Sequence, residues 1–243
     1  MLTHPTLNNL KSLKLLGMIK AFESQQRTPE VLDMTFEDRL GLLVDAQIIE
    51  RDNKALQSRL KTAHLRQSAC IEDISLKQHR GIDKSLWLSL CDCEWANQHK
   101  NILVTGKTGV GKSFIAAALA QKACRDGYSA VFHRTQRLFH ELAVAKATAK
   151  YSKALAALQN KDVLVMDDFA LAPLNDEQRR DLLEILDDRY NKRSTIIVSQ
   201  LPVELWHDTI GDPTIADAIL DRVVHNSYKL TLGGPSLRDP KNQ

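Results

Sequence analysis

The chain has 243 residues, 43% of them hydrophobic, which suffices for one large domain or for a medium domain with a small one. Its formal net charge is only +3, so charge alone does not indicate a nucleic-acid partner. The sequence contains no run of 18 apolar residues and no signal-peptide pattern, and we therefore expect a cytoplasmic protein without a membrane span. The four cysteines lack the spacing of a zinc site and are expected to be reduced thiols.

Three zones follow one another along the chain. Residues 1–68 carry no strand signal and predict a small all-helical domain, which we expect to bind DNA or a partner. Residues 69–98 are less regular and predict a linker with a helix that leads into the next zone. Residues 99–243 alternate strand and helix patterns, which predicts an α/β domain with a parallel sheet and helices on both faces.

The first zone contains two predicted helices. Leucine and isoleucine recur at helical spacing over residues 6–22, which predicts one helix, and the pair at residues 28–29 interrupts the pattern. Thr35 is followed three residues later by Asp38, the pattern of an N-terminal capping box. We therefore expect a second, long helix over residues 36–66.

The third zone contains four short apolar runs that predict buried parallel strands. They lie at residues 101–105, 130–132, 163–166 and 195–198. Helical patterns precede or separate these strands, at residues 86–95, 114–124 and 176–190. In such a sheet, ligands bind beyond the carboxyl ends of the strands.

Residues 106–113 read Gly-Lys-Thr-Gly-Val-Gly-Lys-Ser and match the Gly-x-x-x-x-Gly-Lys-Ser/Thr phosphate-binding loop. A strand pattern precedes the loop and a helix pattern follows it, as this motif requires. In such a loop, backbone N–H groups surround the phosphates, Lys112 reaches the β- and γ-phosphates, and the Ser113 hydroxyl binds Mg²⁺. The predicted nucleotide-binding residues are Gly106, Thr108, Gly109, Val110, Gly111, Lys112, Ser113 and Phe114.

Polar side chains follow the third and fourth predicted strands. Asp167 is placed to hold Mg²⁺, directly or through water, and Asp168 is placed to orient or deprotonate an attacking water. The last predicted strand ends in Ser199 and Gln200 and would lie beside the strand of the phosphate loop. Either of these two side chains could then hydrogen-bond the γ-phosphate or the attacking water. Together these groups predict a hydrolytic nucleotide site.

The order of the phosphate loop, Val-Met-Asp-Asp at residues 165–168 and Ile-Val-Ser-Gln-Leu-Pro at residues 197–202 resembles AAA+ ATPases of the initiator and helicase-loader clade. Three further segments are similar to the IstB family, the ATPase helper proteins of insertion-sequence transposons, which are akin to the helicase loader DnaC. They are residues 13–18, residues 187–190 and, most specifically, Gly-Asp-Pro-Thr-Ile-Ala-Asp-Ala-Ile-Leu-Asp-Arg at residues 211–222. The resemblance implies a P-loop AAA+ fold, ATP and Mg²⁺ as cofactors, and a homo-oligomer with nucleotide at its subunit interfaces.

The resemblance also implies roles for two arginines. Arg222 matches the arginine that acts in trans on the nucleotide of a neighbouring subunit, and Arg238 resembles the nucleotide-sensing arginine that acts in cis. Only a short stretch follows Arg238, so we expect an ATPase domain without a C-terminal helical lid. Asp168 stands where the superfamily usually has the longer Glu, and we therefore expect slow, assembly-dependent hydrolysis.

Basic side chains gather in two segments that could contact DNA. The first, residues 53–70, holds no acidic residue and predicts a helix with a basic outer face. The second lies between the second and third predicted strands, where Glu141 is its only acidic neighbour. Neither segment has the aromatic residues of a base-stacking groove, which favours contacts to a duplex backbone. The predicted DNA-binding residues are Lys54, Arg59, Lys61 and Arg66 in the first segment, and Arg134, Arg137, Lys146 and Lys150 in the second.

We therefore expect a transposition helper ATPase that oligomerises on double-stranded DNA and assists a cognate transposase in target selection and insertion. A DnaC-like replicative helicase loader is the main alternative, because the residues do not tell a transposase partner from a helicase. A small-molecule kinase would need a lid over the phosphates, which the sequence does not show, and would leave Arg222 unexplained. A fourth interpretation is a nucleotide-gated scaffold that barely hydrolyses ATP.

Overall fold

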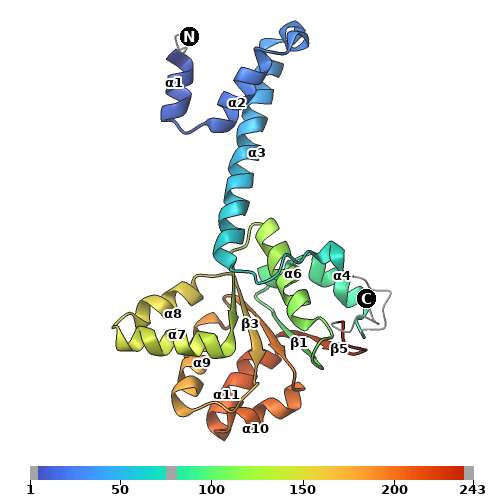
Figure 1. Ribbon diagram of the computed structural model, residues 1–243, viewed down its shortest axis with the longest axis vertical. Coiled ribbons are helices and arrows are strands. Elements are labelled where there is room, and N and C mark those ends of the chain that lie inside the picture. Colours follow the sequence, from blue (N-terminus) through green and yellow to red (C-terminus); the bar gives the residue numbers. More distant parts are fainter. Residues whose placement is uncertain (1–4, 75–80, 238–243) are drawn as a thin grey trace. The chain divides into compact units, whose positions relative to one another are not determined.

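The computed structural model describes residues 5–74 and 81–237, and the chain divides into two compact units, Met1–Ser58 and Arg59–Gln243. The division falls inside one long helix, α3 (Phe36–Ala63) (Figure 1). The first unit therefore ends earlier than the predicted helical domain. Its described residues form helices and turns only.

In the first unit, the single helix predicted over residues 6–22 is wrong. Two helices, α1 (Pro5–Ser12) and α2 (Leu16–Gln25), take its place. Lys14, between them, has φ +60°, a left-handed conformation that does not continue an α-helix. A 3₁₀ turn, η1 (Pro29–Asp33), follows and leads to α3.

Helices α2 and α3 pack closely at Gly17. A Cβ on this residue would overlap the carbonyl oxygen of Ala46, so only glycine allows this approach. The Gln47 side-chain oxygen accepts the backbone N–H groups of Gly17 at 2.9 Å and Met18 at 3.3 Å. Gln47 thereby satisfies backbone donors that the first turn of α2 leaves open.

The two ends of α3 have local causes. At its start, the backbone N–H of Asp38 donates to the Thr35 hydroxyl over 3.2 Å, which agrees with the predicted cap. The helix ends at Ala63 rather than at the predicted Arg66. His64 follows with φ +51°, and this left-handed residue stops the helix.

The second unit is built on a five-stranded parallel sheet with the strand order β2-β3-β4-β1-β5 (Figure 1). The strands are β1 (Asn101–Gly106), β2 (Ala130–Arg134), β3 (Val163–Phe169), β4 (Ser194–Ser199) and β5 (Ser227–Leu232). All four predicted strands are confirmed. The fifth, β5, pairs with β1 at the edge of the sheet and was not predicted. Its buried Leu230 and Leu232 alternate with exposed polar residues, so it lacks the continuous apolar run of a central strand.

Helices cover both faces of the sheet, as predicted (Figure 1). Leu103, Met166 and Ile197 face one buried cluster, to which the helices after β2 contribute. Helix α6 packs against β1 to β4 on the other face. The helices and turns of this unit are η2 (Ile71–Asp73), α4 (Lys84–Cys91), α5 (Glu94–Asn97), α6 (Lys112–Arg125), α7 (Thr135–Ala147), α8 (Tyr151–Gln159), α9 (Asp176–Arg189), η3 (Val203–Leu205), α10 (Trp206–Ile210) and α11 (Pro213–Val224).

The helix predicted over residues 86–95 is divided into α4 and α5, because Cys93 between them has φ +55°. The four cysteines are free, as expected. Burial raises the pKa of the Cys93 thiol to about 12, so this group is an inert thiol at neutral pH. None of the helices in the described ranges has the length and apolar character needed to span a bilayer.

Candidate nucleotide-binding site

The phosphate-binding loop connects the end of β1 to the start of α6, so the predicted order of strand, loop and helix is confirmed. Gly106, Gly109 and Gly111 have φ of +143°, +87° and +96°, which favour glycine. A Cβ on Gly106 would also overlap the carbonyl oxygen of Leu232 at the end of β5. The loop thus lies at the amino end of α6, where open N–H groups and the helix dipole favour a bound phosphate.

The segment after β5 folds back onto this loop. The Leu237 backbone N–H donates to the Gly109 carbonyl over 2.9 Å, and a Cβ on Gly109 would overlap the Ser236 hydroxyl. The sequence did not predict this contact, since no motif marks these two residues. Arg238, the predicted cis-acting sensor, lies outside the described residues.

Lys112 and Ser113 begin α6 and reach two sides of the loop. The Lys112 ammonium donates to the Lys107 carbonyl over 2.8 Å. The Ser113 hydroxyl donates to Asp167 Oδ1 over 2.9 Å, although 54 positions separate the two residues. Asp167 is only 2% exposed, and burial, together with the negative charge of Asp168, raises the pKa of its carboxyl. The two residues predicted to share Mg²⁺ therefore lie in contact.

The Ser113–Asp167 pair fits Mg²⁺ in its chemistry. Both groups supply oxygen, and a buried carboxylate gains stability from a nearby cation. Among residues 5–74 and 81–237, no group of three or more His, Cys, Asp or Glu side chains could hold a metal by itself. A Mg²⁺ ion held by one carboxylate, a hydroxyl, water and the phosphates of a nucleotide needs no such group. The site therefore suits Mg²⁺ that arrives with a nucleotide.

Asp168 lies in a distorted part of β3. Its φ is +56°, and the pairing of β3 with β4 shifts in register between Met166 and Phe169. Successive side chains of a regular strand point to opposite faces, so this distortion is what allows both carboxylates to line one site. The Asp168 backbone N–H donates to Asp167 Oδ1 over 3.0 Å, and Arg134 Nε lies 3.4 Å from Asp168 Oδ2. The carboxylate pair therefore lies at the carboxyl ends of the strands, where it was predicted, with an arginine beside it.

The two polar residues that follow the last apolar run of β4 have different positions. Strand β4 lies next to β1, as predicted. Ser199 is fully buried, and its hydroxyl donates to the Phe169 carbonyl over 2.9 Å and accepts the Leu201 N–H over 3.1 Å. Gln200 is exposed and accepts the Thr108 hydroxyl over 2.7 Å. The predicted nucleotide contact of Ser199 is therefore corrected, and Gln200 is the side chain at the phosphate loop.

Two adjoining cavities surround these groups. The nucleotide cavity, of about 240 Å³, is lined by residues of the loop together with Gln200, Phe114 and Leu237. The magnesium cavity, of about 200 Å³, contains Ser113 and Asp167. Asp168 and Gln67 line both cavities. Gln67 follows α3 and was not predicted, because a single glutamine in a polar segment carries no recognisable signal.

Arg222 lies at the opposite end of the sheet from the phosphate loop. The Asn101 side chain donates to the Arg222 carbonyl over 3.1 Å. Asn101 begins β1 and Gly106 ends it, and a strand of this length spans about 17 Å. The Arg222 side chain is paired with Asp187 at 2.7 Å. Arg222 is therefore too far from the phosphate loop of its own chain to contact a nucleotide there.

The basic residues predicted to bind DNA do not form two free surfaces, which corrects the sequence interpretation. Arg59 donates to the Cys124 carbonyl over 2.8 Å and so points back onto α6. Lys146 contacts Asp181 at 2.6 Å and Glu177 at 2.9 Å, two acids that folding brings from α9. Both residues therefore have structural partners within the second unit.

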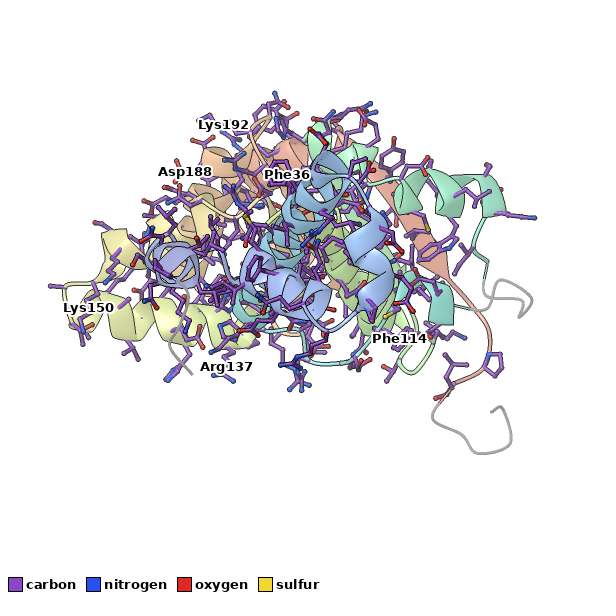
Figure 2. All side chains as sticks on the ribbon, turned by 90° about the horizontal axis from the view of Figure 1, so that it is seen from above. Phe36, Phe114, Arg137, Lys150, Asp188 and Lys192 are labelled. Carbon is purple, nitrogen blue, oxygen red and sulfur yellow. The ribbon has the colours of Figure 1, made fainter. Side chains whose placement is uncertain are left out.

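The other predicted DNA-binding residues fall into two groups. Lys54, Lys61 and Lys150 are exposed (Lys150 is labelled in Figure 2). Arg66, Arg134 and Arg137 line one common cavity. Arg137 is also paired with Glu141 at 2.9 Å. The first and second basic segments of the sequence thus meet in space.

A comparison with known protein families identifies the family of this chain. A family model described as IstB-like ATP binding protein matches residues 8–243. The chain belongs to this family. The IstB-like protein is 45% identical over 238 residues to an insertion sequence ATP-binding protein of Sinorhizobium fredii, covering 98% of this chain and 97% of that relative. It is 44% identical over 203 residues to the IS1162 ATP-binding protein of Pseudomonas fluorescens, covering 83% of this chain and 88% of that relative.

Solved structures share the fold of the IstB-like protein. The DnaC helicase loader has a TM-score of 0.56 at 22% identity, covering 68% of this chain and 97% of that chain. The replication initiator DnaA, bound to AMPPCP and single-stranded DNA, has a TM-score of 0.58 at 12% identity, covering 71% of this chain and 52% of that chain. At these identities the likeness concerns the fold alone, and it confirms the predicted AAA+ fold class.

Proposed function

We propose that this IstB-like protein is an ATPase that assembles on double-stranded DNA and assists a transposase in choosing a target and inserting a transposon. The observation that carries the proposal is the 2.9 Å contact between Ser113 and Asp167 at the phosphate loop, with Asp168 beside it. The names of the insertion-sequence relatives support a role in transposition.

The first step is the binding of ATP with Mg²⁺. The triphosphate lies against the N–H groups at the start of α6, and Lys112 contacts its β- and γ-phosphates. Ser113 and Asp167 hold Mg²⁺, which when bound neutralises negative charge on the phosphates. Phe114 and Leu237 line the nucleotide cavity and provide the apolar surface for the base and sugar.

The second step is hydrolysis. Asp168 orients or deprotonates the attacking water, and Gln200 hydrogen-bonds the γ-phosphate or this water. Hydrolysis is slow, because Asp168 is one methylene shorter than glutamate and is paired with Arg134. We expect a turnover number below about 10 s⁻¹, the median for enzymes generally.

The site is complete only in a homo-oligomer. Arg222 of one subunit neutralises charge that develops on the γ-phosphate bound by its neighbour. Its distance from the phosphate loop of its own chain supports this arrangement, because an arginine at the far end of the sheet contacts a nucleotide only across an interface. Breaking the Arg222–Asp187 pair is part of assembly.

DNA is bound through its phosphates. The exposed Lys54, Lys61 and Lys150 are the residues best placed for backbone contacts, since they carry charge without a structural partner among the described residues. Such contacts position the protein without reading sequence, and they weaken steeply as salt rises.

A DnaC-like helicase loader is the second candidate, because the likeness to the fold of the DnaC helicase loader covers 68% of this chain. Affinity capture with purified transposase and with purified replicative helicase separates the two functions. Retention of the helicase alone would replace the transposition role with the loader role.

Steady-state ATP hydrolysis, measured with and without duplex DNA, tests the proposed ATPase. The wild-type chain is expected to hydrolyse ATP slowly and faster with DNA, whereas Lys112→Ala abolishes nucleotide binding and Asp168→Asn retains binding but not turnover. Electron microscopy with duplex DNA and a non-hydrolysable ATP analogue tests assembly. Monomers under those conditions, or unchanged turnover in Asp168→Asn, would contradict the proposal.

A further inference from the structure

Arginines from distant parts of the sequence line one cavity of about 630 Å³, which we call the basic cavity. Arg66 comes from the segment after α3, Arg134 ends β2, and Arg137 lies in the first turn of α7. The ring of His64 and the partly buried ring of His133 also line it, together with the acids Glu141 and Asp168. Two basic segments that are separate in the sequence therefore form one site.

The basic cavity adjoins the magnesium cavity. Arg66, Arg134 and Asp168 line both of them. Asp168 lines the nucleotide cavity as well, so the three cavities adjoin one another at this residue. Burial lowers the pKa of His133, and its Nδ1 lies 3.5 Å from a carboxylate oxygen of Glu141.

The charges in the basic cavity do not balance. Glu141 is paired with Arg137 at 2.9 Å, and Asp168 faces Arg134 at 3.4 Å. Within residues 5–74 and 81–237, Arg66 forms no ion pair. Three guanidinium groups thus face two carboxylates, which leaves a positive charge for an external anion. The forked donors of arginine match a phosphate group well.

We propose that the basic cavity binds one backbone phosphate of duplex DNA, held jointly by Arg66 and Arg137. This inference rests on the proposed DNA binding and names its place. The cavity is more than twice the size of the nucleotide cavity, so a phosphodiester with its neighbouring sugars has room. Inorganic phosphate from ATP hydrolysis has the same chemistry, and the experiment separates the two sources.

Fluorescence anisotropy with a labelled duplex, measured across a salt series with the non-hydrolysable analogue present, tests the site. The variants are Arg66→Gln, Arg137→Gln and the double variant, with Lys192→Gln as the control. Lys192 is exposed and lies well apart from Arg137 in Figure 2, and its substitution removes the same single charge. The urea denaturation midpoint of each variant shows whether the second unit is folded.

A shared phosphate has a characteristic result. Each single variant weakens binding and reduces the magnitude of the negative slope of log affinity against log salt by up to about 0.9. The double variant reduces this magnitude by no more than that. Lys192→Gln leaves the slope unchanged, and Arg137→Lys, which retains the charge, restores it. Effects that add to about 1.8 in the double variant would mean two separate phosphates and would overturn the proposal.

Two further outcomes would also overturn it. Wild-type slopes in all variants would place the DNA elsewhere, while a wild-type protein that binds no duplex would contradict the proposed function itself. Calorimetric titration with inorganic phosphate tests whether the basic cavity binds the product of ATP hydrolysis instead. Phosphate binding that is lost in Arg66→Gln, together with unchanged DNA binding, would assign the cavity to the released product.

Discussion

Arg134 Nε lies 3.4 Å from Oδ2 of Asp168, the carboxylate that we propose activates water. Arg134 ends β2, and it stands in register with Asp167 of the neighbouring strand β3. The guanidinium therefore offsets the charge of Asp168. Asp168 has to leave this partner, or share it, before it can accept a proton from water.

Arg134→Ala should raise ATP turnover in the absence of DNA about two- to fivefold, because a partly exposed ion pair contributes about 1 kcal/mol or less. Arg134→Lys keeps the positive charge, so its ATP turnover should stay close to that of the wild type. A phosphate-release assay at saturating ATP and Mg²⁺ measures this effect. Equal or slower turnover in Arg134→Ala would show that the pair does not hold Asp168 back.

Mg²⁺ binding should weaken with falling pH sooner than at an ordinary aspartate. Burial raises the pKa of Asp167, and the metal binds only the deprotonated carboxylate. The affinity for Mg²⁺ in the presence of nucleotide, measured from about pH 5 to about pH 8, should fall through the raised pKa. Asp167→Asn should abolish this pH dependence.

The same group gives a second readout in the metal-free protein. The folded state holds the Asp167 proton more tightly than the unfolded state does, so this residue favours folding at low pH. Its contribution to the free energy of unfolding decreases as pH rises from the ordinary to the raised pKa. Identical pH profiles for the wild type and Asp167→Asn in both measurements would contradict the proposed role of burial.

Gly106→Ala should lower the free energy of unfolding by about 2–4 kcal/mol and abolish nucleotide binding. Gly106 has φ +143°, and its Cβ would overlap the backbone of Leu232. Gly233→Ala is the matched control, since no atom lies within 4 Å of a Cβ there, and it should change stability by about 0.5 kcal/mol or less. Urea denaturation measures both variants. Similar stability in the two would contradict the close approach of β5 to the loop.

Gly17→Ala should destabilise the first unit by about 1–3 kcal/mol, because the new methyl group meets the backbone of α3. Gly41→Ala, on α3, has open space and should instead stabilise the helix by about 0.5–1 kcal/mol. Proteolysis or hydrogen exchange of the first unit reports the difference. We expect the two substitutions to change the free energy of unfolding in opposite directions. Changes in the same direction would contradict the packing of α2 on α3.

Local patterns were sufficient to predict the centre of the second unit. The phosphate loop, the buried strands β1, β3 and β4, and the Asp167–Asp168 pair all follow from short runs of neighbouring residues. Strand β5 was not predicted, because its buried Leu230 and Leu232 alternate with exposed residues and form no apolar run. The break at Lys14 was also missed, since the apolar spacing continues across a residue with positive φ.

Contacts between distant segments explain the other differences. Arg59 meets the end of α6, and Lys146 meets acids of α9, so neither can be judged from its neighbours in sequence. The family motif at residues 187–190 also makes contacts with distant segments. Arg189 in it is buried and donates to carbonyls just before β3 and at the start of β4. Its role there is structural.

The central claim is that each ATP site needs residues from two subunits. ATP hydrolysis by a mixture of Lys112→Ala and Arg222→Ala proteins with duplex DNA tests this claim most directly, because each protein alone lacks one half of every site. Random assembly of an equal mixture should restore about a quarter of the wild-type turnover, since one interface in four then combines an intact loop with an intact arginine. A mixture as inactive as its components, or an Arg222→Ala protein with wild-type turnover, would contradict the account.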